Sequence, residues 1–282
     1  MFNEERFAQI IHASRKRLGL TQKKVSELTG ITQGTLSKIE NYEISVSARN
    51  WFLLSQALDI PHHSAYCGFI DRGLKAKKIK TTSKNIFKMP TKYRKNACST
   101  VKDLMPFILF VQKKYGADSF KDFLKEVSVP EYFFIDLNNK INFLFAYDLL
   151  IHFCGNITDE LLNSVARCST MKEAHGTLID IYKKKHMSLG KLKAYIKRAD
   201  FYESCTDYSI VEKGNEKLII ELDLSEYLQE QMSEEFVETF VLPYRINFLK
   251  EFANDRVEDK FDLSVSKKAT QGHYMLEAQL IS

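Results

Sequence analysis

Apolar residues in the first 61 positions recur every three or four residues, which is the spacing of helices that bury one face. Phe7, Ile10 and Ile11 show this spacing in the first segment, and three further segments follow before Pro61. Residues that begin or end helices separate the segments, so each predicted helix is short. The predicted helices cover residues 4–18, 22–29, 33–41 and 48–60. The pattern therefore predicts a small all-α domain.

The connection between the second and third of these helices is very short. Gly30 can end the second helix, and only Ile31 separates it from Thr32, whose hydroxyl can cap the third. Two short helices joined this tightly must cross at a steep angle. This is the helix-turn-helix arrangement, in which the second helix of the pair presents its amino end to the major groove of DNA.

A second pattern begins near residue 96, where helical spacing is followed by the alternation of strands. The predicted helices cover residues 101–115, 119–127, 139–153, 158–167, 191–199 and 233–252, the last kinked at Pro243, and the predicted strands cover 208–211, 218–222, 261–265 and 274–281. The predicted fold class is thus an all-α amino-terminal helix-turn-helix domain plus a larger α+β carboxy-terminal domain, in which helices are followed by two β-hairpins.

Charge divides the chain in the same way. The formal net charge of +5 consists of +11 over residues 1–100 and −6 over the remainder. Residues 72–95 contain ten Lys or Arg and no Asp or Glu, which predicts a basic linker over 67–95 between a domain at 1–66 and one at 96–282. Its lysines either follow the DNA backbone as an arm or keep a solvated spacer extended. The candidate arm residues are Lys75, Lys77, Lys78 and Lys80.

Several other classes of protein do not fit this sequence. It has no uncharged apolar stretch of membrane-spanning length, so we expect a cytoplasmic protein without a membrane partner. Its five cysteines are odd in number and widely spaced, which argues against a disulfide framework or a zinc finger. His152 and Cys154 fall in an apolar helix and are expected in the core rather than on a metal. Because the sequence also lacks the common catalytic motifs, we expect no enzyme, cofactor or metal.

The segment from Leu18 to Asn41, LGLTQKKVSELTGITQGTLSKIEN, resembles the phage repressor and Cro type of helix-turn-helix, the XRE family. The resemblance covers about residues 6–61. It implies that Gln22, after the cap of the first motif helix, holds a DNA phosphate. It also implies that Thr35 and Asn41 contact the DNA backbone and that the start of the next helix reads bases. The implied reading positions are Gln33, Gly34, Ser37 and Lys38.

The chemistry of these residues agrees with the roles that the resemblance implies. Gln can pair with two edge atoms of adenine, and Lys can donate to the acceptors of guanine. Gly34 has no side chain, so we expect it to permit close approach of the DNA. Arg15 and Glu40 match a pair that forms a structural salt bridge in some family members. Tyr42 departs from the family, which usually has a left-handed glycine there, so a different turn is expected.

The functional prediction is a sequence-specific transcription regulator that binds a near-palindromic operator in double-stranded DNA as a homodimer. Its carboxy-terminal domain would supply dimerisation, or sense a small-molecule or protein effector, and its order of elements is faintly similar to the ligand-binding half of some AraC-type regulators. The aromatic residues of 233–252 suit a pocket, a dimer seam or, more simply, the core. The alternative is an antitoxin-like or adaptor protein that mainly binds protein and uses its head for autoregulation. At position 43 the family often has a basic residue that would face phosphate, whereas this chain has Glu43.

Overall fold

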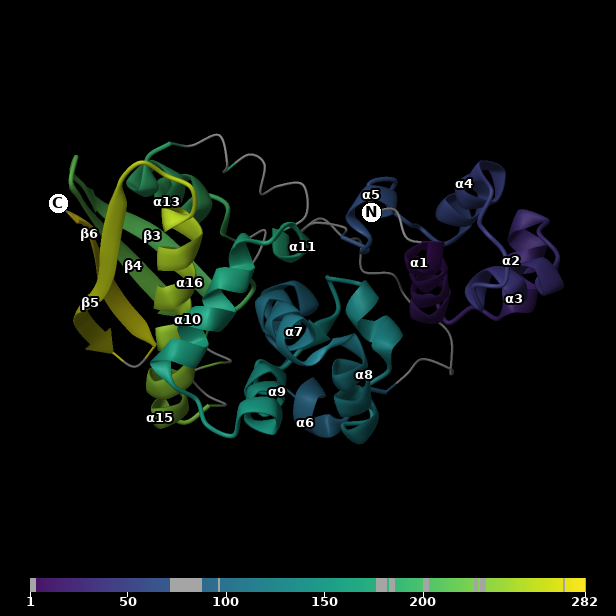
Figure 1. Ribbon diagram of the computed structural model, residues 1–282, viewed down its shortest axis with the longest axis horizontal. Coiled ribbons are helices and arrows are strands. Elements are labelled where there is room, and N and C mark those ends of the chain that lie inside the picture. Colours follow the sequence, from purple (N-terminus) through teal and green to yellow (C-terminus); the bar gives the residue numbers. More distant parts are fainter. Residues whose placement is uncertain are drawn as a thin grey trace. The chain divides into compact units, whose positions relative to one another are not determined.

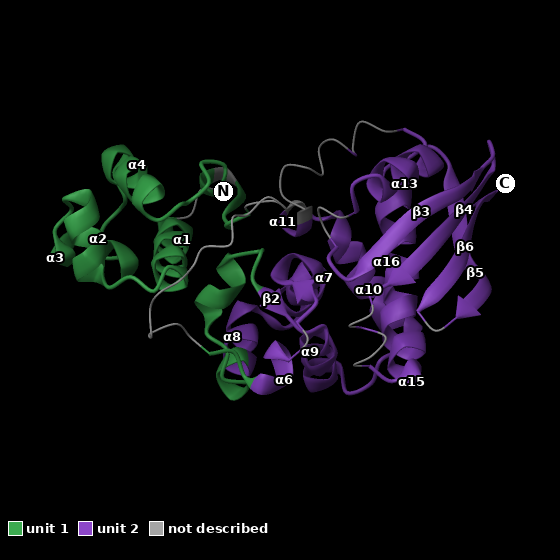
Figure 2. Cartoon of the chain, turned by 180° about the vertical axis from the view of Figure 1, so that it is seen from behind, with its two compact units in different colours: residues 1–90, 124–139 green, residues 91–123, 140–282 purple. Residues whose placement is uncertain are grey.

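The computed structural model describes residues 4–71, 88–95, 97–175, 182, 186–199, 203–225, 228, 232–270 and 272–281 (Figure 1). The chain divides into two compact units, one of residues 1–90 with 124–139, the other of residues 91–123 with 140–282 (Figure 2). The domain ranges 1–66, 67–95 and 96–282 remain a prediction from the sequence. Lys75, Lys77, Lys78 and Lys80 lie outside the described residues.

The four amino-terminal helices form where the sequence predicts them. They are α1 (Glu4–Arg17), α2 (Gln22–Thr29), α3 (Gln33–Glu40) and α4 (Ala48–Ala57), followed by the single turn α5 (Ser64–Cys67). Three of them begin at a hydroxyl cap, because the side chains of Thr21, Thr32 and Ser47 each accept from a backbone N–H in the first turn. Gly30, at φ +71°, ends α2 in the left-handed conformation.

The hydrophobic core of the first unit is small. Its members from the predicted helices include Ile10, Val25, Leu36, Ile39 and Leu54. The sequence pattern also indicates Leu28 and Phe52 as buried, and this is wrong, because they are 55% and 52% exposed. A short helix needs only one or two residues per turn to close so small a core, so apolar residues at its margins stay in solvent.

A distant part of the chain completes this unit. The 3-10 helix η1 (Glu131–Ile135) packs against α1, and Ile135 joins the core. The backbone of Ile70 donates to the Ile135 carbonyl and accepts from Leu137 N–H, both at 2.9 Å, in a parallel bridge. Backbone pairing this short leaves no periodic pattern in the sequence.

The longer helices of the second unit follow the predicted order. Three short ones were not predicted, namely Thr91–Arg94, which lies in the predicted linker, Cys168–Thr170 and Lys172–His175. Up to residue 196, the described helices are α6 (Thr91–Arg94), α7 (Val101–Tyr115), α8 (Ala117–Glu126), α9 (Leu144–Cys154), α10 (Asp159–Arg167), η2 (Cys168–Thr170), α11 (Lys172–His175) and α13 (Ser188–Ile196). Only α9 starts much later than predicted. The preceding residues form β2 (Lys140–Ile141), which pairs with β1 (Ser99–Thr100), and the side chain of Asn142 accepts from Leu144 N–H.

The four predicted strands form one antiparallel sheet in the order β3-β4-β6-β5. They are β3 (Thr206–Lys213), β4 (Lys217–Leu224), β5 (Lys260–Thr270) and β6 (His273–Ile281). The two predicted hairpins are present, and β4 pairs with β6 to join them. Alternate residues of β4 are buried, and helices α13 and α16 (Leu242–Asn254) cover that face of the sheet (Figure 1).

The predicted helix over 233–252 is interrupted where proline requires it. It consists of α15 (Glu234–Phe236), a π-helical turn η5 (Val237–Val241) and α16, which has Pro243 in its first turn. Proline has no N–H for the helical ladder, so the change of winding falls directly before it. Four of its five aromatic residues are core, as the simplest interpretation predicts: Phe240, Tyr244, Phe248 and Phe252 are each at most 3% exposed, whereas Phe236 is half-buried.

The last turn of α9 differs from the expectation that it lies in the core. His152 is exposed in the last turn of α9, so its predicted place in the core is wrong, whereas Cys154 is half-buried. Periodicity describes the centre of a helix better than its frayed end.

Among the helices of the described residues, none is long and apolar enough to span a membrane.

Candidate nucleic-acid interface and a basic pocket

The third helix presents one face to solvent and the opposite face to the core. Leu36, Ile39 and Glu40 are buried, while residues 33, 34, 37, 38 and 41 share the outer face by their helical spacing. Exposure of the seven predicted DNA-contacting residues follows this division: Gln33, Gly34, Lys38 and Asn41 are exposed, and Gln22, Thr35 and Ser37 are half-buried. The structure thus places the four predicted reading residues and Asn41 on one face, and Thr35 lies outside that face.

A buried ion pair holds the recognition helix α3 against α1. The Nε and Nη2 atoms of Arg15 each donate to a carboxylate oxygen of Glu40 at 2.6 Å, and the two side chains are 9% and 4% exposed. Gln22 donates from Nε2 to Glu40 Oε2 at 3.0 Å. This bond orients the Gln22 amide and leaves its second N–H for an acceptor such as a phosphate oxygen.

The first turn of α3 is fixed by two threonines. The Thr32 hydroxyl accepts from Thr35 N–H at 3.1 Å, and the two hydroxyls lie 2.8 Å apart. The capped amino end of the helix carries a positive partial charge, which favours an approaching anion. A Cβ built on Gly34, beside this end, would meet nothing within 4 Å. The space above Gly34 is therefore open to a partner.

The turn after α3 keeps the left-handed residue despite the absence of glycine. Tyr42 has φ +63°, its N–H bonds to the Ile39 carbonyl, and Glu43 N–H bonds to the Lys38 carbonyl at 2.9 Å. These two bonds form a Schellman motif, which satisfies the last carbonyls of the helix. The expectation of a different turn is wrong, because the hydrogen bonds outweigh the steric cost of the tyrosine. Asn41, the predicted backbone contact, donates to the Glu43 carboxylate at 3.4 Å.

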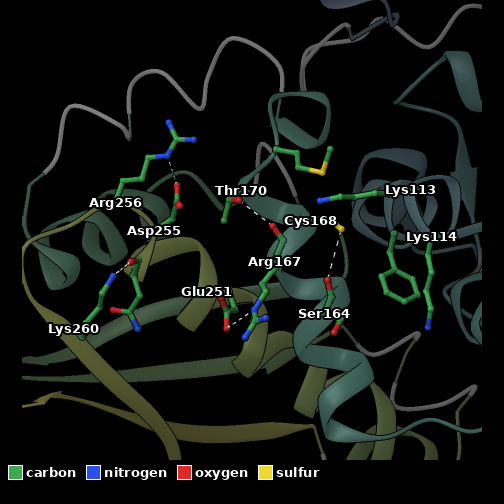
Figure 3. Close-up of a pocket in the computed structure, with 13 residues that line it drawn as sticks. Lys113, Lys114, Ser164, Arg167, Cys168, Thr170, Glu251, Asp255, Arg256 and Lys260 are labelled. Atoms are coloured by element: carbon green, nitrogen blue, oxygen red, sulfur yellow. Dashed lines mark hydrogen bonds and ion pairs between the residues drawn. The ribbon is translucent and has the colours of Figure 1, made fainter.

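The second unit contains a large basic pocket of about 920 Å³ that the sequence did not indicate (Figure 3). Its walls come from the carboxyl ends of α7, α10 and α16 and from the start of β5. The charged residues that line it are Lys113, Lys114, Arg167, Glu251, Asp255, Arg256 and Lys260. Residues so far apart in the sequence share no motif that could have predicted the pocket. The only local indication is the pair of lysines, Lys113 and Lys114, in the last turn of α7.

One group of possible metal ligands lies on the sheet, within the part of the chain that the structure describes. Glu221, Asp223 and His273 meet there because Asp223 pairs with His273 across β4 and β6. His273 Nε2 lies 3.2 Å from Glu221, and Nδ1 contacts Asp223, which raises the pKa of the imidazole. The two carboxylates thus already share the imidazole of His273 as a partner. The alternation of β4 indicates from the sequence that Glu221 and Asp223 share one face of the sheet. The sequence does not indicate that His273 joins them, because it lies 50 residues after Asp223.

The solved structures that this chain resembles weakly include H-NOX domains. An iron(II) unliganded H-NOX protein from K. algicida is 10% identical, with 65% of this chain and 97% of that chain covered and a TM-score of 0.46. A point mutant of that protein is 9% identical over the same shares, with a TM-score of 0.47. An oxygen-binding H-NOX domain related to soluble guanylate cyclases is 11% identical, covering 63% and 92%, with a TM-score of 0.44. No curated protein matches the chain.

The family comparison concerns the amino-terminal helices. The family described as helix-turn-helix matches residues 11–63, the span from the middle of α1 to just past α4. This range includes both capped helices of the motif, the Glu40 ion-pair partner and the Schellman turn at Tyr42. Residues 11–63 are a helix-turn-helix of the Cro/C1 type and belong to the XRE family.

Proposed function

We propose that this protein is a sequence-specific transcription regulator that binds double-stranded DNA through α3 of each subunit in a homodimer. The observation that carries the proposal is the outer face of α3. It is exposed and free of acidic residues, and the Arg15–Glu40 pair holds it rigidly from behind. A preorganised helix face of this kind suits recognition in the major groove.

The residues divide into two roles. Gln33 and Lys38 are exposed and carry the donors and acceptors that read base edges. Gln22, Thr35 and Asn41 contact phosphates, which sets the register of the helix without reading sequence. Ser37 lies between the two reading side chains on the same face, and Gly34 allows the backbone to approach the DNA.

The test uses the full chain. Selection from a random duplex library, read by sequencing, is expected to enrich a near-palindromic site, and fluorescence anisotropy then gives its affinity at several salt concentrations. Failure to enrich any site would overturn the proposal and would favour a protein-binding adaptor or antitoxin-like role. Affinity for the enriched site should fall steeply with salt, because phosphate contacts release counterions.

Variants separate the two roles. Gln33→Ala is expected to weaken binding to the enriched site by about 1–3 kcal/mol and to relax preference at one base pair. Gln56→Ala, an exposed glutamine on α4, is the matched control and should bind normally. Gly34→Ala should stabilise the helix, since alanine is the better helix former, and still weaken DNA binding. Normal binding by Gly34→Ala would contradict the close approach.

We propose that the second unit supplies dimerisation and effector response, without enzyme activity. The pocket of about 920 Å³ supports the second of these roles, because effector sites are concave and combine apolar walls with a few polar groups. Sedimentation of the full chain with and without a duplex carrying two half-sites tests the dimer. One chain per duplex would contradict it.

A further inference from the structure

The pocket of the second unit is unusually basic. Five cations and two carboxylates line it, and three helices, α7, α10 and α16, end beside it. Each helix end contributes roughly half a negative charge, which is the ordinary reason for cations at such a place. The five cations exceed the two carboxylates by three positive charges. The three helix ends together supply roughly one and a half negative charges, which neutralise only about half of that excess. The pocket therefore keeps a positive potential beyond what its helix ends require.

Several of these cations retain hydrogen-bonding capacity. Arg167 Nε lies 3.6 Å from Glu251, and Arg256 Nε lies 3.9 Å from Asp255, distances longer than those of charge-assisted hydrogen bonds (Figure 3). The side chains of the two arginines are 70% and 76% exposed, so these ion pairs are weak. Lys113 makes no ion pair within the part of the chain that the structure describes. Both guanidinium groups can therefore turn toward an anion.

The rest of the lining combines apolar side chains with the polar residues Ser164, Thr170 and Asn254. Phe110 and Cys168 are 8% and 6% exposed, and Met171 is half-buried beside them. Lys113 lies close enough to affect the Cys168 thiol. Burial raises the pKa of this thiol, and the positive charge of Lys113 lowers it in part. A ligand that fills the pocket thus meets apolar side chains, a thiol and cations close together.

We propose that this pocket binds an organic anion with an apolar body and one carboxylate, sulfonate or phosphate group. The anionic group pairs with Lys113 and Arg167, and the apolar body lies on Phe110 and Met171. The inference rests on the proposed function, since it names the chemical class of the effector. Binding by the pocket does not itself require DNA, so the two can fail separately.

The test is calorimetric titration of the full chain with naphthalenesulfonate. Naphthalenemethanol lacks the charge and sulfate lacks the ring, so each tests one half of the proposal. One naphthalenesulfonate per chain is expected to bind at least tenfold more tightly than either control, a difference of about 1.4 kcal/mol. Equal affinity for naphthalenemethanol, equal affinity for sulfate, or no binding of naphthalenesulfonate would each overturn the proposal.

Variants locate the site. The double variant Lys113→Gln/Arg167→Gln should bind naphthalenesulfonate about tenfold or more weakly, because two charges next to the anion are lost. Lys213→Gln, an exposed lysine on β3, is the matched control and should bind as the parent does. Unchanged affinity in the double variant would overturn the assignment. If DNA selection fails while this titration succeeds, the pocket stands and the regulator proposal falls.

Cys98 and Cys205 of the second unit lie on two segments that contact each other. Residues 98–99 cross residues 204–205, because Ser204 donates from Oγ to the Cys98 carbonyl at 2.6 Å and Ser99 Oγ lies 3.0 Å from Cys205 Sγ. These contacts bring Cys98 next to Cys205, and the Cys205 thiol lowers the pKa of Cys98 to about 7. Arg245 Nη2 approaches Cys205 Sγ at 3.9 Å, which places a buried cation beside the pair.

From this geometry we infer that hydrogen peroxide converts Cys98 and Cys205 into a disulfide. The Cys98 thiolate attacks one peroxide oxygen, the O–O bond breaks, and the departing hydroxide leaves as water after taking a proton. Cys205 sulfur then attacks the sulfenic sulfur of Cys98, the S–O bond breaks, and the thiol proton leaves with the hydroxide as a second water. Two thiols are oxidised by two electrons, and one peroxide is reduced to two waters.

Peptide mapping tests the inference. The full chain is treated with hydrogen peroxide, alkylated without reductant, digested and analysed by mass spectrometry. A peptide joining Cys98 to Cys205 is expected to be the main crosslink and to disappear with dithiothreitol. Cys98→Ser should abolish it, and Cys67→Ser, which changes a half-buried cysteine of the first unit, should not. Sulfinic acid at Cys98 without the crosslinked peptide would overturn the pairing.

Discussion

Replacement of Arg15 by methionine tests whether the ion pair behind α3 holds the first unit together. In the parent, Arg15 donates twice to Glu40 at 2.6 Å and once, from Nη1, to the Leu20 carbonyl at 3.0 Å. Arg15→Met fills a similar volume but leaves the Glu40 carboxylate, 4% exposed, with Gln22 as its hydrogen-bond donor. Removing one partner of a buried pair costs about 3–5 kcal/mol.

This loss is large for so small a domain, whose total stability is about 5–15 kcal/mol. Urea unfolding followed by tryptophan fluorescence measures this loss of stability. Trp51 is the only tryptophan of the chain, and its ring centroid lies 4.7 Å from that of Phe7, so its signal reports on the first unit. With an m value of about 1 kcal/mol per molar urea, the midpoint of the tryptophan transition should fall by about 3 M or more.

Two further variants complete the experiment. Arg15→Met/Glu40→Leu removes both charges and should recover to within about 1 kcal/mol of the parent, since the stranded carboxylate is gone. Arg49→Met, an exposed arginine of α4, is the control and should shift stability by about 0.5 kcal/mol at most. A loss below about 1 kcal/mol in Arg15→Met, or no recovery in the double variant, would refute the reasoning.

Three other predictions follow from the same structure. Tyr42→Gly should stabilise the first unit by about 1 kcal/mol in the same urea assay, because glycine adopts φ +63° without strain, and a destabilised variant would contradict this. Arg245→Met should lower the thermal midpoint seen by circular dichroism, since it strands Glu203, whose side chain is 2% exposed, at a cost of about 3–5 kcal/mol. Adding Glu203→Gln should restore part of that midpoint, and a double variant no better than the single one would argue against the pair. For His273, whose pKa is raised by Asp223, the ion pair stabilises the fold fully below about pH 6.5 and is lost as pH rises through the raised value. An NMR titration of its ring protons should show this, with Asp223→Asn returning the pKa toward about 6.5, and an unchanged value would exclude the partner.

The local elements of this protein could be predicted from the sequence because local interactions determine them. The hydroxyl caps at Thr21, Thr32 and Ser47 act within one helical turn, and Gly30 ends its helix by its own conformational freedom. The recognition surface was predictable for the same reason. Its residues lie within one eight-residue helix, whose spacing decides which side chains face solvent.

Tertiary structure decided the features that join distant segments. Pairing of Ile70 with residues 135–137 and of β4 with β6, and the contact of residues 98–99 with residues 204–205, leave no periodic signal in either partner. The basic pocket likewise draws on several distant elements, and each of its cations by itself is an ordinary lysine or arginine. The sequence by itself determined the helix-turn-helix and its reading face, since these depend on neighbours along the chain. The pocket and the thiol pair depend on which elements pack together, and only long-range burial of apolar surface settles that.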